Sequence, residues 1–211
     1  VTVTSSYDKK RQQSQLTITY DITPDGAVKV TMHFMPDSLE LPEMPRLGMR
    51  MILPARFDQM KWYGRGPQEN YADRKTGALI GQYSASVWEQ YHPYVRAQET
   101  ANKCDVRWVS LQDQSGKGLI VRGLEPLSVS AWNFPQDDIL YRPAIIEHHH
   151  GGSVTRKDMV WLNIDHRQMG VGGDNSWGAQ VHSEYTITPK EWTYGFVLEP
   201  LSKKKKKKSE N

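Results

Sequence analysis

Leu16-Thr17-Ile18-Thr19-Tyr20-Asp21-Ile22-Thr23-Pro24-Asp25-Gly26-Ala27-Val28-Lys29-Val30-Thr31-Met32-His33-Phe34 is the stretch of sequence that decides the fold class. Apolar side chains occupy alternate positions on both sides of Pro24-Asp25-Gly26, as in strands, where successive side chains point to opposite faces. Proline, aspartate and glycine in a row favour a tight turn. The stretch therefore predicts two antiparallel strands, each with one buried face.

The same alternation recurs along the rest of the chain. It is found at Thr2–Thr4, Leu47–Leu53, Val160–Asp165 and Trp192–Leu198, and Val181, Tyr185 and Ile187 extend it before Trp192. Turn residues separate these segments at Ser115-Gly116, Gly151-Gly152 and Pro189-Lys190. There is no long amphipathic helix, and Pro135–Leu140 predicts one short helical turn. About a dozen short strands predict an all-β antiparallel sandwich.

Length and composition are typical of a globular domain. The chain has 211 residues, of which 37% are hydrophobic and 24% charged, and this excludes a disordered chain. No apolar run reaches the roughly 20 residues that a membrane-spanning helix needs, so we expect no membrane partner. Cys104 is the one cysteine, which excludes an internal disulfide framework and a cysteine-based zinc site.

The net charge of +3 is produced by one run, Lys203–Lys208. That run holds six of the 27 basic residues, and Glu210 behind it is one of the 24 acidic residues. Residues 1–202 therefore carry 21 basic and 23 acidic residues, a net charge of −2. We predict a domain over residues 1–202 with no basic face for nucleic acid, and a disordered lysine-rich tail over residues 203–211.

A polar loop interrupts the strand pattern after Trp62-Tyr63. It continues as Gly64-Arg65-Gly66-Pro67-Gln68-Glu69-Asn70-Tyr71-Ala72-Asp73-Arg74, and we call residues 62–74 the signature loop. Its side chains can satisfy the backbone groups that a turn leaves unpaired. We expect a structural loop pinned by Arg65, Glu69, Asn70 and Arg74, and direct ligand contact is the alternative.

A glycine-rich segment follows the Val160–Asp165 strand. It reads Met169-Gly170-Val171-Gly172-Gly173-Asp174-Asn175-Ser176-Trp177-Gly178, and it lacks both the dinucleotide fingerprint and the ending of a phosphate loop. Trp177 is the candidate binding residue, because a rigid indole can stack on the C–H face of a sugar ring. Burying about 50 Å² of apolar surface would contribute on the order of 1 kcal/mol. The alternative is a tryptophan packed into the core.

Glu147-His148-His149-His150 is the one histidine cluster. In a strand His148 and His150 would share a face and could meet one metal ion, but no third ligand is evident. Neutral, hydrogen-bonded histidines are the preferred interpretation, and we predict no metal site. A serine nucleophile is also not indicated, because no strand-turn-helix elbow would position one.

The signature loop resembles the Gly-x-Gly-Pro-x-Glu-Asn-Tyr-x-Asp-Arg signature of the C-terminal domain of bacterial β-galactosidases, in glycoside hydrolase family 2. Tyr91-His92-Pro93-Tyr94, Cys104-Asp105-Val106-Arg107 and the segment from Trp161 to Trp177 resemble the same domain in order and spacing. The similarity extends from Tyr20 to Phe196. It implies an antiparallel β-supersandwich of the galactose-mutarotase-like type, which is longer than this chain, so its N-terminal strands are expected to be absent.

The resemblance also implies a function. Such enzymes hydrolyse terminal β-D-galactosides with retention, using two glutamates of a TIM barrel that has no counterpart here. No catalytic residue is therefore expected in this chain, which alone should be inactive. Trp177 aligns with a tryptophan that lines the substrate entrance and stacks on the sugar. Asp174 and Asn175 are implied as weaker contacts, and Asn175 replaces an aspartate of the best-known relatives.

The resemblance places the magnesium and sodium sites of these enzymes outside this segment, so no cofactor is expected in the chain. The implied partners are the remaining domains of the polypeptide, a galactoside substrate, and further copies in a homo-oligomer. Two rival functions are an autonomous carbohydrate-binding module and an aldose epimerase that moves protons with His148, His150 or Glu147. Val1 in place of an initiator methionine predicts a piece of a longer polypeptide. The start of the chain carries no targeting information, so the choice between cytoplasm and periplasm stays open.

Overall fold

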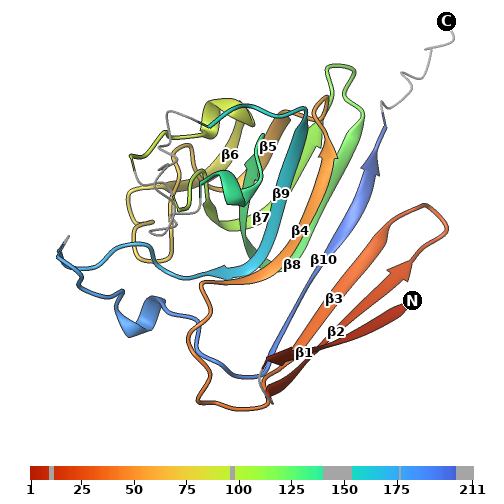
Figure 1. Ribbon diagram of the computed structural model, residues 1–211. Helices are drawn as coiled ribbons and strands as arrows, with labels where there is room; N and C mark the ends of the chain where they lie inside the picture. The colour runs from red at the N-terminus through yellow and green to blue at the C-terminus, as the bar shows by residue number, and fades with distance from the viewer. Residues whose placement is uncertain (10–11, 96–97, 140–153, 176, 203–211) are drawn as a thin grey trace, which may run out of the picture.

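Ten antiparallel strands make up the described part of the molecule (Figure 1). The computed structural model describes residues 1–9, 12–95, 98–139, 154–175 and 177–202. In chain order the elements are β1 (Thr2–Lys9), β2 (Gln12–Ile22), β3 (Val28–Met35), β4 (Arg46–Pro54), β5 (Gln59–Gly66), β6 (Leu79–Ser86), η1 (Trp88–Gln90), β7 (Lys103–Gln112), β8 (Gly118–Trp132), η2 (Gln136–Asp138), β9 (Met159–Gln168), η4 (Ser183–Tyr185) and β10 (Trp192–Leu201), where η denotes a 3₁₀ helix. Within these ranges no helix is long and apolar enough to cross a bilayer.

The long strand β8 joins two branches of the sheet. The strand order is β1-β2-β3-β10-β8-β7-β5-β6, and β9 pairs with both β8 and β4. The first half of β8 pairs with β10, from Gly118 to Gly123, whereas its second half pairs with β9, from Ser128 to Trp132. Figure 1 shows β9 beside β8 with β4 paired to β9, and the β1–β2–β3 branch at the lower right, reached through β10.

The hydrophobic core lies where the strands turn their apolar faces to one another. Val30 of β3 and Val160, Leu162 and Ile164 of β9 are each at most 1% exposed. They pack into one cluster with residues of β4, β5, β7, β8 and β10. A smaller aromatic cluster around Trp132 and Phe134 lies at the end of β8. Alternation of apolar side chains therefore gives the sandwich its interior.

The described structure confirms the all-β antiparallel class and most of the predicted segments. Thr2–Thr4, Leu16–Tyr20, Val28–Phe34, Leu47–Leu53, Val160–Asp165 and Trp192–Leu198 lie in β1, β2, β3, β4, β9 and β10. The turns at Pro24-Asp25-Gly26 and Ser115-Gly116 have glycine at positive φ, 86° and 80°. The helical turn expected over Pro135–Leu140 is present as η2.

The strand expected over Val181–Ile187 is wrong. This segment contains η4, whose turn is closed by hydrogen bonds from Tyr185 N to His182 O and from Thr186 N to Ser183 O. The three apolar residues do not alternate strictly, because Ser183 interrupts the pattern. Only Ile187 of the three is buried in the core. The histidine cluster at residues 147–150 and the lysine run at residues 203–208 lie outside the described residues.

Candidate functional site

The candidate binding residue lies on a loop that leaves the sheets between β9 and β10. We call residues 169–182 the Trp177 loop, which runs away from the sheets at the lower left of Figure 1 before it returns through η4. Trp177 is 93% exposed, more than any other large apolar side chain in the described residues. The alternative in which this indole packs into the core is therefore wrong. Its aromatic surface is free for contact with a partner or ligand.

The two weaker candidates beside Trp177 take part in contacts within the loop. Asn175 Oδ1 accepts a hydrogen bond from the backbone N–H of Trp177 at 2.8 Å. Asp174 Oδ1 lies 2.9 Å from His182 Nε2, with both side chains largely exposed. Asn175 therefore shapes the backbone that presents the indole, and Asp174 links the middle of the loop to its C-terminal end.

The signature loop uses its polar side chains to hold its own backbone. Asn70 Oδ1 accepts from the amide of Cys104 at 2.8 Å, and its Nδ2 donates to Gln68 O at 3.0 Å. Glu69 Oε2 accepts from the amide of Ala101 at 2.7 Å. Asn102 Nδ2 donates back to the carbonyl of Asn70 at 2.8 Å. These bonds join the loop to the segment that enters β7, in accordance with the need of buried backbone groups for partners.

The two arginines of the signature loop are also bound within the fold. Arg65 pairs with Asp105 at 2.5 Å and donates to the carbonyl of Ala78 at 2.8 Å. The guanidinium of Arg74 lies 4.9 Å from the centre of the Tyr71 ring and 3.1 Å from Glu69. Both cations thus lie against groups of this chain, which is the arrangement of a structural loop.

The two motif loops meet at Asp73. Its Oδ2 accepts a hydrogen bond from the backbone N–H of Gly172 at 2.8 Å, across 99 residues of sequence. Gly170 lies so close to Asp73 that a Cβ there would stand 2.7 Å from the carboxyl carbon. Asp73 belongs to the signature loop, but it was not among the site residues expected from the sequence. No local pattern could have singled it out, because its partner is remote in sequence.

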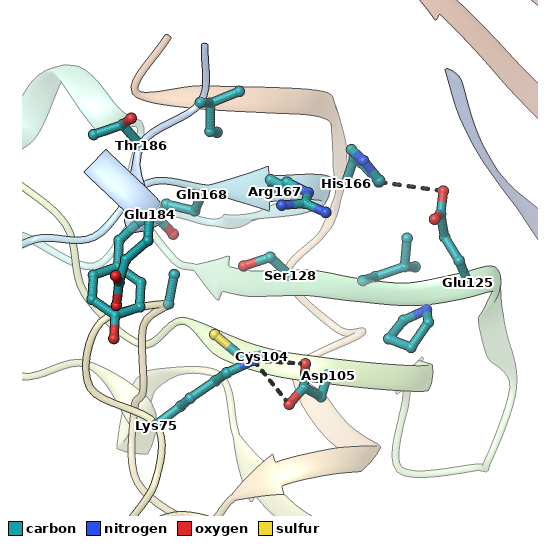
Figure 2. Close-up of a pocket in the computed structure, with 15 residues that line it drawn as sticks. Lys75, Cys104, Asp105, Glu125, Ser128, His166, Arg167, Gln168, Glu184 and Thr186 are labelled. Carbon is teal, nitrogen blue, oxygen red and sulfur yellow. Dashed lines mark hydrogen bonds and ion pairs between the residues drawn. The ribbon is translucent and has the colours of Figure 1, made fainter. Parts of the chain in front are cut away.

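A polar cavity of about 320 Å³ lies beside this junction (Figure 2). Its floor is made by β7, β8 and β9, and residues of η4 and the signature loop complete it. Figure 2 shows two side-chain pairs in it: the ion pair of Lys75 with Asp105, at 3.1 Å, and the contact of His166 with Glu125, at 3.3 Å. Burial alone would raise the pKa of Asp105, but its bonds to Arg65 and Lys75 outweigh this effect and lower it.

Burial sets the protonation states of two side chains of this cavity, His166 and Cys104. Burial lowers the pKa of His166, against the opposing charge of Glu125, so the imidazole is neutral at pH 7. Burial also raises the pKa of the Cys104 thiol to about 11, so the thiol is protonated and is a weak nucleophile. Among the described residues, no group of three or more histidine, cysteine, aspartate or glutamate side chains could hold a metal ion.

A buried cluster of ionisable side chains around β4 and β9, formed by Arg46, Glu99 and Asp165, was not foreseen from the sequence. Asp165 is 1% exposed and lies 3.1 Å from Arg46, which also pairs with Glu99 at 2.8 Å. Gly48 makes room for it at a β-bulge, since a Cβ there would lie 2.0 Å from Asp165 Oδ1. In the alternating pattern, Asp165 lies on the face of β9 opposite the apolar one, where exposure to solvent would be expected. That face is buried too, since Asn163 on it is likewise 1% exposed.

Three comparisons relate the chain to known proteins. The family model described as beta galactosidase small chain matches residues 1–198. The chain is 40% identical over 186 residues to a beta-galactosidase of Priestia megaterium, covering 87% of this chain and 17% of that protein. Identity is 35% to the beta-galactosidase of Vibrio cholerae and 34% to that of Lactobacillus delbrueckii subsp. bulgaricus, with 85% and 90% of this chain and 16% and 18% of those proteins covered.

A galactose mutarotase related enzyme from Lactobacillus acidophilus is a structural neighbour, with a TM-score of 0.44 and 11% sequence identity. The match covers 95% of this chain and 68% of that one. Among the curated relatives, this chain spans less than a fifth of the length of the three beta-galactosidases above.

Proposed function

This chain belongs to the beta-galactosidase small-chain family, and from that membership we propose that it is the part of a larger β-galactosidase that places Trp177 at the active-site entrance. The observation that carries the proposal is the 93% exposure of this indole on a loop tied to the family's signature loop. A tryptophan exposed in this way offers a flat apolar face to the C–H groups of a pyranose ring. Stacking of this kind orients a sugar without holding it tightly.

The bond-breaking chemistry belongs, in this proposal, to another part of the polypeptide. Retaining hydrolysis in the manner of glycoside hydrolase family 2 requires two carboxyl groups about 5 Å apart, one as nucleophile and one as acid and base. We assign these to a TIM barrel outside this chain, together with the magnesium and sodium sites of such enzymes. The remaining domains are then the partners of this chain, terminal β-D-galactosides are the substrates, and the full enzyme is a homo-oligomer.

Trp177→Ala in the full-length polypeptide is expected to raise KM for lactose about fivefold. Losing a stacking contact on the order of 1 kcal/mol accounts for a change of this size. Transfer of galactose to sugar acceptors should fall as well, because an acceptor at the entrance would stack on the same ring. Initial rates over a range of lactose concentrations, with product analysis for transfer, measure both effects.

Two variants serve as controls for this experiment. Trp177→Phe keeps an aromatic face and should retain most of the wild-type KM, whereas Val171→Ala shortens an exposed side chain of the same loop and should leave KM unchanged. Lactose kinetics that do not differ between wild type and Trp177→Ala would contradict the proposed role. A saturable fluorescence change when lactose is titrated into the isolated chain would instead favour an autonomous carbohydrate-binding module.

A further inference from the structure

The carboxylate of Asp73 is the contact between the two motif loops, and we propose that Asp73 is a positioning residue for Trp177. The expected effect on substrate binding rests on the proposed function. The expected effect on the loop does not: Asp73 fixes the base of the Trp177 loop through the N–H of Gly172, five residues before the indole. On this view the signature loop serves the binding site although it touches no substrate.

Asp73 is mounted on a rigid turn. The Arg74 amide donates to Tyr71 O at 2.9 Å, and the Tyr71 amide donates to Arg74 O at 3.4 Å, so the turn is closed on both sides. Tyr71 is 1% exposed, and the guanidinium of Arg74 covers its ring. Glu69 pairs with Arg74 at 3.1 Å. A carboxylate carried by such a turn has a fixed direction, as a positioning group requires.

The Trp177 loop is shaped to receive this carboxylate. Gly170 and Gly172 both face Asp73, and a Cβ at these positions would lie 2.7 Å from its Cγ and 3.4 Å from its Oδ2. The amide of Gly170 donates to Tyr185 O at 2.9 Å, which holds the same stretch against η4. The base of the loop is therefore clamped between the signature turn and η4.

The chemistry of the contact favours a strong tie. The amide of Gly172 donates to an ionised oxygen, and hydrogen bonds of this kind are about twice as strong as those between neutral groups. The second oxygen, Asp73 Oδ1, is buried and accepts no hydrogen bond from the described residues. An asparagine could therefore keep the bond to Gly172 through its amide oxygen, with its amide nitrogen in place of Oδ1.

Restricting the base of the loop also restricts the indole. The loop contains four glycines, at positions 170, 172, 173 and 178, and such a segment loses much conformational entropy when it is ordered. On the N-terminal side of Trp177, the bond from Gly172 to Asp73 lies nearest in sequence to the indole among the hydrogen bonds that tie the described loop residues to the rest of the molecule. A sugar that meets a loop already held in place does not have to order it on binding.

The test uses Asp73→Ala and Asp73→Asn in the full-length polypeptide, with Asp113→Ala as a matched control. Asp113 also accepts backbone amides, those of Ser115 and Lys117, but at the turn between β7 and β8. Amide hydrogen exchange of the segment containing Gly172 should be about tenfold faster in Asp73→Ala. It should be accelerated by a smaller factor in Asp73→Asn, which keeps an acceptor for Gly172 but loses the charge, and unchanged in Asp113→Ala.

Lactose kinetics supply the second readout. Asp73→Ala should raise KM about as much as Trp177→Ala, with a smaller effect on kcat. In a Trp177→Ala background the same change should have no further effect on KM, because Asp73 acts through the indole. If Asp73→Ala does not fold, as judged by its thermal transition, Asp73→Ser with its shorter side chain takes its place in both measurements.

The outcomes separate this inference from the proposed function. Unaltered exchange at Gly172 in Asp73→Ala would overturn the positioning role whatever the kinetics show. An equal rise of KM in wild-type and Trp177→Ala backgrounds would also overturn it, since Asp73 would then act by another route. Wild-type KM in Trp177→Ala would defeat the proposed function alone, because faster exchange in Asp73→Ala would still support the positioning of the loop.

Discussion

Replacing Glu69 with alanine is expected to lower the free energy of unfolding of this chain by about 3–5 kcal/mol. Its carboxylate is 13% exposed, pairs with Arg74 and accepts from the Ala101 amide and the hydroxyls of Tyr71 and Tyr94. Burial raises the pKa of the Tyr71 hydroxyl, so this group remains a donor at neutral pH. Alanine would leave these donors without an acceptor, at about 1–3 kcal/mol for each buried group.

Urea denaturation at pH 7 measures this effect, with unfolding followed by tryptophan fluorescence. Glu43→Ala is the matched control, because Glu43 is exposed in the segment between β3 and β4, and its loss should change stability by less than about 0.5 kcal/mol. Glu69→Gln should fall between the two, since it keeps an acceptor and loses the charge. Equal stability of Glu69→Ala and wild type would refute the role of this carboxylate in holding the signature loop.

The buried carboxyl group of Asp165 predicts a stability that falls as the pH rises from about 4 to 7. Complete burial raises its pKa from 3.8 to about 7, although Arg46 and Arg50 oppose the shift, and the charge of Glu99 adds to it. Between these values the folded chain holds a proton that the unfolded chain has released. Unfolding therefore becomes easier with increasing pH, by on the order of 3–4 kcal/mol across the interval.

Asp165→Asn should remove this pH dependence, because the amide does not titrate. The free energy of unfolding of the variant minus that of wild type should rise steadily from pH 4 to pH 7. Loss of the contact with Arg46 would shift this difference by the same amount at every pH and would not change its slope. Glu99, whose pKa is also raised by burial, remains in both proteins, so the difference between them reports Asp165 together with its interaction with Glu99. Urea denaturation at pH 4.5, 6 and 7.5 measures the difference, with exposed Asp158→Asn as control. A constant difference across this range would mean that Asp165 stays ionised in the folded chain.

Much of the fold could be predicted from the sequence because strand formation leaves a local pattern. The buried positions of β3 and β9, such as Val30 and Leu162, alternate with their neighbours, and glycine marks the turns. The prediction of a strand was wrong over Val181–Ile187, where the alternation is incomplete. The alternation also does not indicate that both faces of a strand are buried. Asp165 illustrates the second case, since the chain that buries it comes from distant segments.

The candidate site divides in the same way. The glycines and polar residues around Trp177 indicated a loop, but they left open whether the indole was buried, and its 93% exposure answers that question. Asp73 could not be chosen from the sequence. Its partner Gly172 is 99 residues away, and the sequence around either residue does not indicate the contact with the other.

The sequence by itself determined the secondary structure class, the turns at Pro24-Asp25-Gly26 and Ser115-Gly116, and the two segments that depart from regular strands, because these depend on neighbours along the chain. Only the tertiary structure decided which strands lie side by side and which loops meet. His33 and Glu191, 158 residues apart, lie 2.7 Å from each other where β3 runs beside β10. Such pairings are fixed by the mutual burial of remote apolar faces, and the contact between the signature loop and the Trp177 loop is a consequence of that packing.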